Sequence, residues 1–159
     1  MADYSISEVL NFALKMEEHG EKFYEYAAEN IKHKDLQKVF SALALEEKHH
    51  AAVFEKMLAE TAHTKILRVG AADYVHYLAR HIETKSVYKK KDFEAIKGKM
   101  KSITDVIVFA MDREIDSVVY YSEMKKHLAE KNYAIFDNII NEEIKHFTKL
   151  EKAKKLIVK

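Results

Sequence analysis

The sequence contains no cysteine and no proline among its 159 residues, and only three glycines. Without cysteine this chain forms no disulfide and offers no thiolate to a metal or an iron–sulfur cluster, so any redox chemistry must use other ligands. Proline and glycine disfavour helix interiors more than any other residues, so their scarcity permits long helices. The composition is rich in Ala, Leu, Glu and Lys, and it predicts an all-α protein.

The sequence also lacks an excess of charge of one sign and a long apolar run. It has 27 Lys and Arg residues against 26 Asp and Glu residues, so no strong field attracts nucleic acid or an anionic membrane. No stretch approaches the roughly 20 apolar residues of a membrane-spanning helix. The N-terminus has no basic start followed by an apolar segment. We therefore expect a cytoplasmic protein with one domain, residues 1–159, that binds neither nucleic acid nor membrane.

Apolar residues recur along the chain at alternating steps of three and four, which is the spacing of one buried face of a helix. Possible capping boxes, at Ser5 to Glu8 and at Ser102 to Asp105, indicate where two of these helices begin. The spacing predicts four long helices, over residues 6–31, 35–66, 103–129 and 132–157.

The two halves of the chain form an internal repeat, which we interpret as two related helical hairpins. The first set of matching positions is Ala13, Glu17, Gly20 and Tyr24 against Ala110, Glu114, Ser117 and Tyr121. The second set is Glu47 and His50 against Glu143 and His146. Setting the hairpins side by side requires a connection along the bundle, which residues 67–101 can supply. Within this region we expect short helices at 71–82 and 92–100.

Polar residues interrupt all four apolar faces. They are Glu17, Glu47, His50, Glu114, Glu143 and His146. Burying one unpaired carboxylate costs on the order of several kcal/mol, whereas two divalent cations would balance the negative charge of all four glutamates. Each Glu-x-x-His pair projects from one side of its helix toward the same point. The pattern therefore predicts a di-metal site, and its oxygen and imidazole donors favour iron or manganese, although zinc also binds such ligands.

One glutamate from each of two helices and Glu-x-x-His from each of two others is the ligand set of di-iron carboxylate bundles. On these residues the chain resembles the rubrerythrin branch of the ferritin-like superfamily over nearly its whole length. The stretches that carry the resemblance are Glu17 to Tyr24, Leu45 to His50, Glu114 to Tyr121 and Glu142 to His146.

The resemblance implies a ferritin-like four-helix bundle that forms a homodimer and holds two iron ions. It also implies that the protein reduces hydrogen peroxide or dioxygen with electrons from a small electron-transfer protein. The implied roles are Glu47 and Glu143 as bridging ligands, Glu17 and Glu114 as terminal ligands, and His50 and His146 as caps of one ion each.

The sequence departs from the family pattern at two points. Full-length rubrerythrins carry a cysteine-ligated rubredoxin domain, and this sequence has no cysteine, so we expect electrons to come from a separate donor protein. Full-length members also place a second carboxylate three residues from the glutamate of their third bundle helix. Here the two positions three residues away from Glu114 are Met111 and Ser117, which bears on how efficiently the protein reduces peroxide.

Residues beside the predicted ligands need a separate interpretation. One position along a helix turns a side chain by roughly 100°, which places four of them at the flanks of the site or around its ligands. These four are Glu18, Glu46, His49 and Glu142. We expect His19 to be exposed. Tyr24 and Tyr121 follow Glu17 and Glu114 by seven residues; core packing is their commoner role, whereas the resemblance suggests that their hydroxyls hydrogen-bond ligand carboxylates.

Two other functions are compatible with the same pattern of buried glutamates and histidines. A ferroxidase or iron-storage protein would have the same ligands but would assemble into a large hollow shell. A metal-free structural bundle would instead pair its buried glutamates and histidines with one another, at a cost in stability.

Overall fold

The computed structural model describes residues 6–61, 77–82 and 102–157, and four long helices account for most of them. These are α1 (Ile6–Asn30), α2 (Lys34–Thr61), α5 (Ile103–Lys125) and α6 (Tyr133–Ile157), with a short 3-10 turn, η1 (Glu130–Asn132), before α6. No strand occurs among the described residues. The prediction of an all-α four-helix bundle is confirmed.

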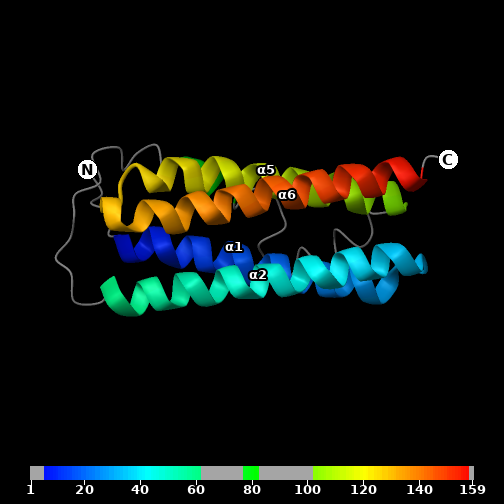
Figure 1. The fold of residues 1–159 in the computed structure, drawn as a ribbon, viewed down its shortest axis with the longest axis horizontal. Coiled ribbons are helices and arrows are strands. Elements are labelled where there is room, and N and C mark those ends of the chain that lie inside the picture. The colour runs from blue at the N-terminus through cyan, green and yellow to red at the C-terminus, as the bar shows by residue number, and fades with distance from the viewer. Residues whose placement is uncertain (1–5, 62–76, 83–101, 158–159) are drawn as a thin grey trace.

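The helices form two hairpins that lie side by side (Figure 1). Helices α1 and α2 make the first hairpin, and α5 and α6 make the second. Because α2 and α5 run in the same direction, Thr61 and Ile103 lie at opposite ends of the bundle. Of the helix predicted at 71–82, residues 77–82 are described and are helical, and Leu78 and Ile82 from this segment pack into the core. The rest of that helix, and the one predicted at 92–100, lie outside the described residues.

The start of α5 has the capping box that the sequence predicts. The Ser102 hydroxyl accepts a hydrogen bond from the backbone N–H of Asp105 at 3.1 Å, and the Asp105 carboxylate accepts one from the N–H of Ser102 at 2.9 Å. Two N–H groups that a helix start leaves without intrahelical partners are thereby satisfied. The capping box predicted at Ser5 lies outside the described residues.

The end of α5 differs from the sequence prediction. We expected this helix to continue to residue 129, but it ends at Lys125. The backbone N–H of Lys126 donates to the carbonyl of Glu123, and that of His127 donates to the carbonyl of Met124, which tightens the last turn before the chain bends into η1. The helix end could not be predicted from apolar periodicity, because the periodicity continues to Leu128, which packs into the core from the turn after the helix.

Two apolar clusters fill the bundle, one toward each end. The cluster at the end where α1 begins includes Leu10, Phe54 and Phe136. The other includes Phe40 and Leu150. Each buried aromatic or leucine side chain contributes roughly 1.5–3 kcal/mol relative to an exposed one. The clusters hold the four helices together on both sides of the polar residues that lie midway along the bundle.

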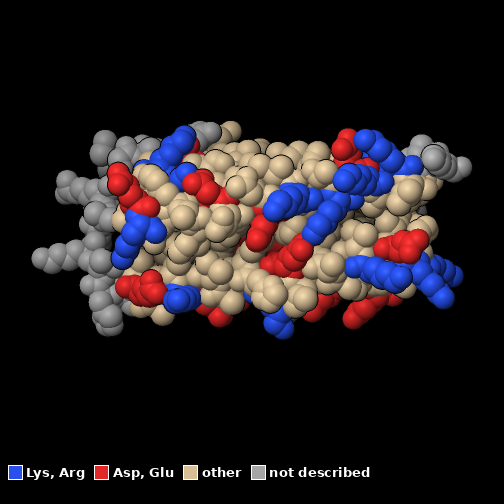
Figure 2. Space-filling model, in the orientation of Figure 1, with Lys and Arg blue, Asp and Glu red and all other residues tan. Residues whose placement is uncertain are grey.

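The surface carries both signs of charge. Figure 2 shows Lys and Arg interspersed with Asp and Glu on one face of the bundle. Within the described part of the chain, no helix has an apolar stretch long enough to cross a membrane.

The capping box gives a direct test of the start of α5. Ser102→Ala removes the hydroxyl that accepts from Asp105, and we expect it to lower the free energy of unfolding by about 1 kcal/mol. Chemical denaturation followed by circular dichroism measures this change. Ser102→Asp, which keeps an acceptor at the same position, should restore most of the loss. An alanine variant as stable as the wild type would contradict the capping role.

Candidate metal centre

The structure brings all six predicted ligands into one layer of the bundle. Their side chains are at most 3% exposed. They are Glu17 from α1, Glu47 and His50 from α2, Glu114 from α5, and Glu143 and His146 from α6. Each occupies a position on the apolar face of its helix, so the packing that buries that face also carries the polar side chain inside.

The six residues form two groups that overlap. The first group is Glu17, Glu47, His50 and Glu143, and the second is Glu47, Glu114, Glu143 and His146. Within each group, one nitrogen or oxygen atom from every residue lies within 4.8 Å of all the others. Glu47 and Glu143 belong to both groups. Two cation positions that share two carboxylates therefore fit this arrangement.

Both histidines direct Nδ1 toward the carboxylates. The Nδ1 atom of His50 lies 2.8 Å from Glu143 Oε1 and 3.4 Å from Glu17 Oε2. The Nδ1 atom of His146 lies 3.5 Å from Glu114 Oε2. The two rings stack with their centroids 5.7 Å apart and their planes 19° apart. Two imidazole nitrogens thus face the carboxylate groups from the side of the bundle formed by α2 and α6.

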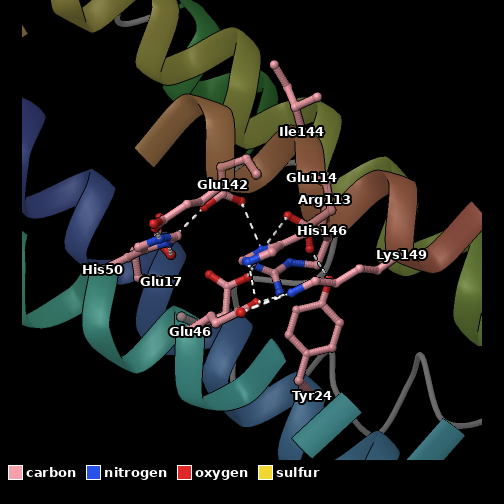
Figure 3. A network of polar contacts seen from close by, with 12 residues as sticks. Glu17, Tyr24, Glu46, His50, Arg113, Glu114, Glu142, Ile144, His146 and Lys149 are labelled. Atoms are coloured by element: carbon pink, nitrogen blue, oxygen red, sulfur yellow. Dashed lines mark hydrogen bonds and ion pairs between the residues drawn. The ribbon is translucent and has the colours of Figure 1, made fainter. Parts of the chain in front are cut away.

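The other nitrogen of each histidine contacts a carboxylate on the opposite hairpin (Figure 3). His50 Nε2 lies 2.6 Å from Glu142 Oε2, and His146 Nε2 lies 2.8 Å from Glu46 Oε2. The Glu46 carboxylate also accepts from Lys149 Nζ at 2.8 and 2.9 Å. When the imidazole is neutral, a proton held at Nε2 leaves the Nδ1 lone pair free for a metal ion. Glu46 and Glu142, which the sequence placed around the ligands, lie where they can set this tautomer.

Two buried tyrosines hold the remaining glutamates. The Tyr24 hydroxyl on α1 donates to Glu114 Oε1 on α5, and the Tyr121 hydroxyl on α5 donates to Glu17 Oε1 on α1. Burial and the negative charge of Glu114 raise the pKa of Tyr24 well above its usual value, and burial and Glu17 do the same for the pKa of Tyr121. Both tyrosines therefore stay neutral donors. They pack in the core, as their spacing indicated, and they also make the hydrogen bonds that the resemblance suggested.

The four buried glutamates divide into two pairs by the direction in which their pKa values are shifted. Burial raises the pKa of Glu47, and the negative charge of Glu17 raises it further. Burial and the charge of Glu47 likewise raise the pKa of Glu143. Burial would also raise the pKa of Glu17, but hydrogen bonds with Glu47 and His50 outweigh the effect of burial and lower this pKa. The pKa of Glu114 is lowered against burial by its contacts with His146 and Glu143.

The histidines carry protons in the absence of a metal. Burial alone would lower their pKa values, but the adjoining carboxylates outweigh it. Contacts with Glu17 raise the pKa of His50 to about 10, and contacts with Glu114 raise the pKa of His146 to about 11. At neutral pH, protons on the two imidazoles thus neutralise part of the charge that metal ions would otherwise balance, and the raised pKa values of Glu47 and Glu143 act in the same direction.

Several inward-facing atoms of the predicted ligands make no hydrogen bond of good geometry, although charged groups lie close to them. These atoms are Glu17 Oε2, His50 Nδ1, both carboxylate oxygens of Glu143, and His146 Nδ1. A buried polar atom without a hydrogen bond costs about 1–3 kcal/mol, so such atoms are rare in a folded protein. All of them belong to predicted ligands and are of the donor types that iron and manganese accept. The residues present therefore fit a pair of divalent cations.

Two residues near the site differ from what the sequence suggested. Arg113 is buried, whereas an arginine is usually predicted to lie on the surface. The one feature of the sequence that could have predicted its burial is its counterpart in the repeat, the core residue Met16. His19 was expected to be exposed, which is wrong: it is half-buried. Burial and the nearby Arg113 lower the pKa of His19 to about 4, so this histidine is neutral at physiological pH.

The fold and the buried Glu/His cluster define a helical bundle of the ferritin-like di-iron carboxylate class. The model of the Rubrerythrin family matches residues 8–156, and the chain belongs to that family. A candidate ferritin-like diiron-carboxylate protein from Thermotoga maritima is similar in structure, with a TM-score of 0.70 and 23% identity over 98% of this chain and 97% of that one. A hypothetical protein from Pyrococcus furiosus has a TM-score of 0.72 and 23% identity over 99% and 93% of the two chains. No curated protein matches the sequence.

The raised pKa values predict that metal binding releases protons. A divalent cation can bind His50 and His146 only after it displaces the protons that these imidazoles hold at neutral pH, and the raised pKa values of Glu47 and Glu143 act in the same direction. Apparent metal affinity should therefore increase from about pH 6 to about pH 8. Calorimetric titration in buffers with different ionisation enthalpies measures the number of protons released. Binding without proton release would contradict these protonation states.

The contacts between histidines and outer carboxylates predict a second effect. Glu142→Gln removes the charge that faces His50 Nε2, and Glu46→Gln does the same at His146, so each should weaken metal binding about 10- to 100-fold. Competition with a chelator measures the affinity. Glu151→Gln is the matched control, because Glu151 lies on α6 in an exposed ion pair with Lys155. Equal affinities in all three variants would rule out this role for Glu46 and Glu142.

Proposed function

We propose that this protein is a non-haem di-iron oxidoreductase that reduces hydrogen peroxide or dioxygen with electrons from a separate donor. The observation that carries the proposal is the pair of four-residue ligand groups that share Glu47 and Glu143. When bound, two iron ions supply a two-electron redox couple beside an oxidant. Family membership supports this class of chemistry over other uses of a divalent pair.

The charges of the site favour a pair of ions over a single one. Four carboxylates contribute four negative charges, which two divalent cations neutralise and one does not. The two histidines, one in each group, add ligand atoms without adding charge once they are deprotonated. Iron is preferred over softer metals because all of the donors are carboxylate oxygens and imidazole nitrogens.

The surrounding residues have distinct tasks in this proposal. Tyr24 and Tyr121 fix the orientation of Glu114 and Glu17 by hydrogen bonds from the facing hairpin. The two apolar clusters exclude water at both ends of the polar layer, which strengthens every electrostatic interaction inside it. The Glu46 and Glu142 side chains, 40% and 52% exposed, connect the buried imidazoles to the surface. They offer a path by which protons can move between solvent and the histidines.

In this proposal, electrons reach the site from a protein other than this chain. The sequence has no cysteine to hold an iron–sulfur or rubredoxin centre, so a separate electron-transfer protein is the expected donor. The surface of the bundle carries both signs of charge, and the donor would approach it as a transient partner.

Metal analysis of the wild type and of Glu47→Ala/Glu143→Ala tests the proposal. These substitutions remove both shared ligands, so we expect about two irons per wild-type chain and almost none in the variant. Optical titration should show that hydrogen peroxide or dioxygen oxidises the reduced wild-type centre. Glu55→Ala/Glu151→Ala, which removes two surface carboxylates from the same helices, should keep both irons.

Three outcomes would contradict the proposal or redirect it. A wild-type protein that is metal-free and equally stable would favour a structural bundle. A large hollow assembly that mineralises iron, measured by light scattering, would favour iron storage. Iron that binds but is oxidised by neither peroxide nor dioxygen would exclude the redox activity.

A further inference from the structure

The two ion positions of the candidate metal centre are built from the same types of ligand. Each has the two shared carboxylates together with one further glutamate and one histidine. The further glutamate is Glu17 in the His50 position and Glu114 in the His146 position. In both, a buried tyrosine donates a hydrogen bond to this glutamate. A difference in strength between the two positions is therefore expected from residues outside this set.

Lys149 contacts the outer edge of the His146 position (Figure 3). Its Nζ atom lies 2.8 Å from Glu46 Oε2 and 2.9 Å from Glu46 Oε1. The same Oε2 atom lies 2.8 Å from His146 Nε2. The lysine and the imidazole thus share one carboxylate oxygen. A positive charge is thereby separated from a predicted metal ligand by a single carboxylate group.

The outer carboxylate of the His50 position has a different environment. Glu142 is the counterpart of Glu46 in the repeat, and its Oε2 atom lies 2.6 Å from His50 Nε2. Within the described part of the chain, Glu142 forms an ion pair with this histidine and with no lysine or arginine. The counterpart of Lys149 is Val53, which is partly buried against one of the two apolar clusters. One imidazole therefore has a carboxylate to itself, whereas the other shares its carboxylate with a cation.

Lys149 could affect the metal centre by holding Glu46 in place or by its charge. Glu142 contacts His50 without a lysine although its side chain is 52% exposed, so a glutamate in this place needs no lysine to hold it. The charge therefore decides the effect. A carboxylate that also binds an ammonium group attracts the Nε2 proton of His146 less strongly, which makes this imidazole a weaker metal ligand. The ammonium charge also repels a divalent cation.

We propose that Lys149 makes the two ion positions unequal, so that the His146 position binds its divalent cation more weakly and fills after the His50 position. The inference rests on the proposed function, because it requires the metal pair. Lys149 binds no metal itself and acts through Glu46 and His146. A chain that carries a single ion then holds it in the His50 position, where three of the four ligands belong to the first hairpin.

Stepwise cobalt binding tests the proposal without catalytic turnover. Competition between the protein and a chelator for Co²⁺ gives a stronger and a weaker binding constant. Lys149→Gln removes the charge from an exposed side chain, and it should raise the weaker constant about threefold to tenfold and leave the stronger one unchanged. Lys149→Arg keeps the charge and should bind both ions as the wild type does. Lys155→Gln, which removes the lysine of an exposed ion pair with Glu151 on the same helix, is the matched control and should change neither constant.

Two histidine variants show at which position the charge acts. His50→Ala keeps the histidine of the His146 position, and adding Lys149→Gln to it should strengthen cobalt binding. His146→Ala keeps the histidine of the His50 position, and adding Lys149→Gln to it should have little effect. Circular dichroism checks that both variants fold. Because Lys149 is exposed, its variants in the otherwise unchanged protein test the proposal even if a histidine variant does not fold.

Three results would overturn the proposal. Lys149→Gln could leave both constants unchanged, or it could raise both by the same factor. It could also lower the weaker constant, in which case the lysine serves to hold Glu46 in place. In each of these cases the wild type still binds two cobalt ions, and the proposed metal function stands. A wild-type protein that binds no cobalt would overturn that function as well, which separates the two failures.

Discussion

The burial of four carboxylates in one layer is the constraint on which the rest of this structure depends. Left ionised and alone, they would repel one another in a medium that screens charge poorly. Without metal, protons on the two histidines offset part of this charge, and the pKa values of Glu47 and Glu143 are raised in the same sense. In the proposed function, divalent cations balance the same negative charge with their own. Protons and metal ions therefore compete for the same atoms, and this competition links folding, metal loading and pH.

The internal repeat explains why the contacts around this layer occur in pairs. Tyr24 reaches across to Glu114 as Tyr121 reaches across to Glu17, and the two histidines likewise take their outer carboxylates from the opposite hairpin. Each hairpin thus completes the half-site of the other. A single hairpin would expose its glutamates and leave its histidines without outer carboxylates. The functional unit is consequently the pair of hairpins, although each carries the same local pattern.

Periodicity identified the ligands because it reports which side of a helix is buried. The six polar residues on apolar faces could be found from sequence for that reason, and the repeat showed that they form two equivalent sets. Contacts that depend on how one helix is rotated against another could not be found in this way. The pairing of Glu142 with His50 is one example, and the burial of Arg113, whose long side chain crosses to α1, is another. The end of α5 was missed because Leu128 keeps the apolar spacing after the helical hydrogen bonds stop.

Two departures, one from the family pattern and one from the internal repeat, change the charge near the layer in the same direction. Met111 and Ser117 stand at the two positions where the resemblance leads one to expect a carboxylate, so one negative charge is missing. Arg113 replaces an apolar counterpart, so one positive charge is gained. Both differences make the surroundings of the carboxylate layer more positive than the repeat and the resemblance predict. A positive charge beside buried carboxylates lowers their affinity for protons and for metal ions alike, so these positions bear on metal loading before any redox step begins.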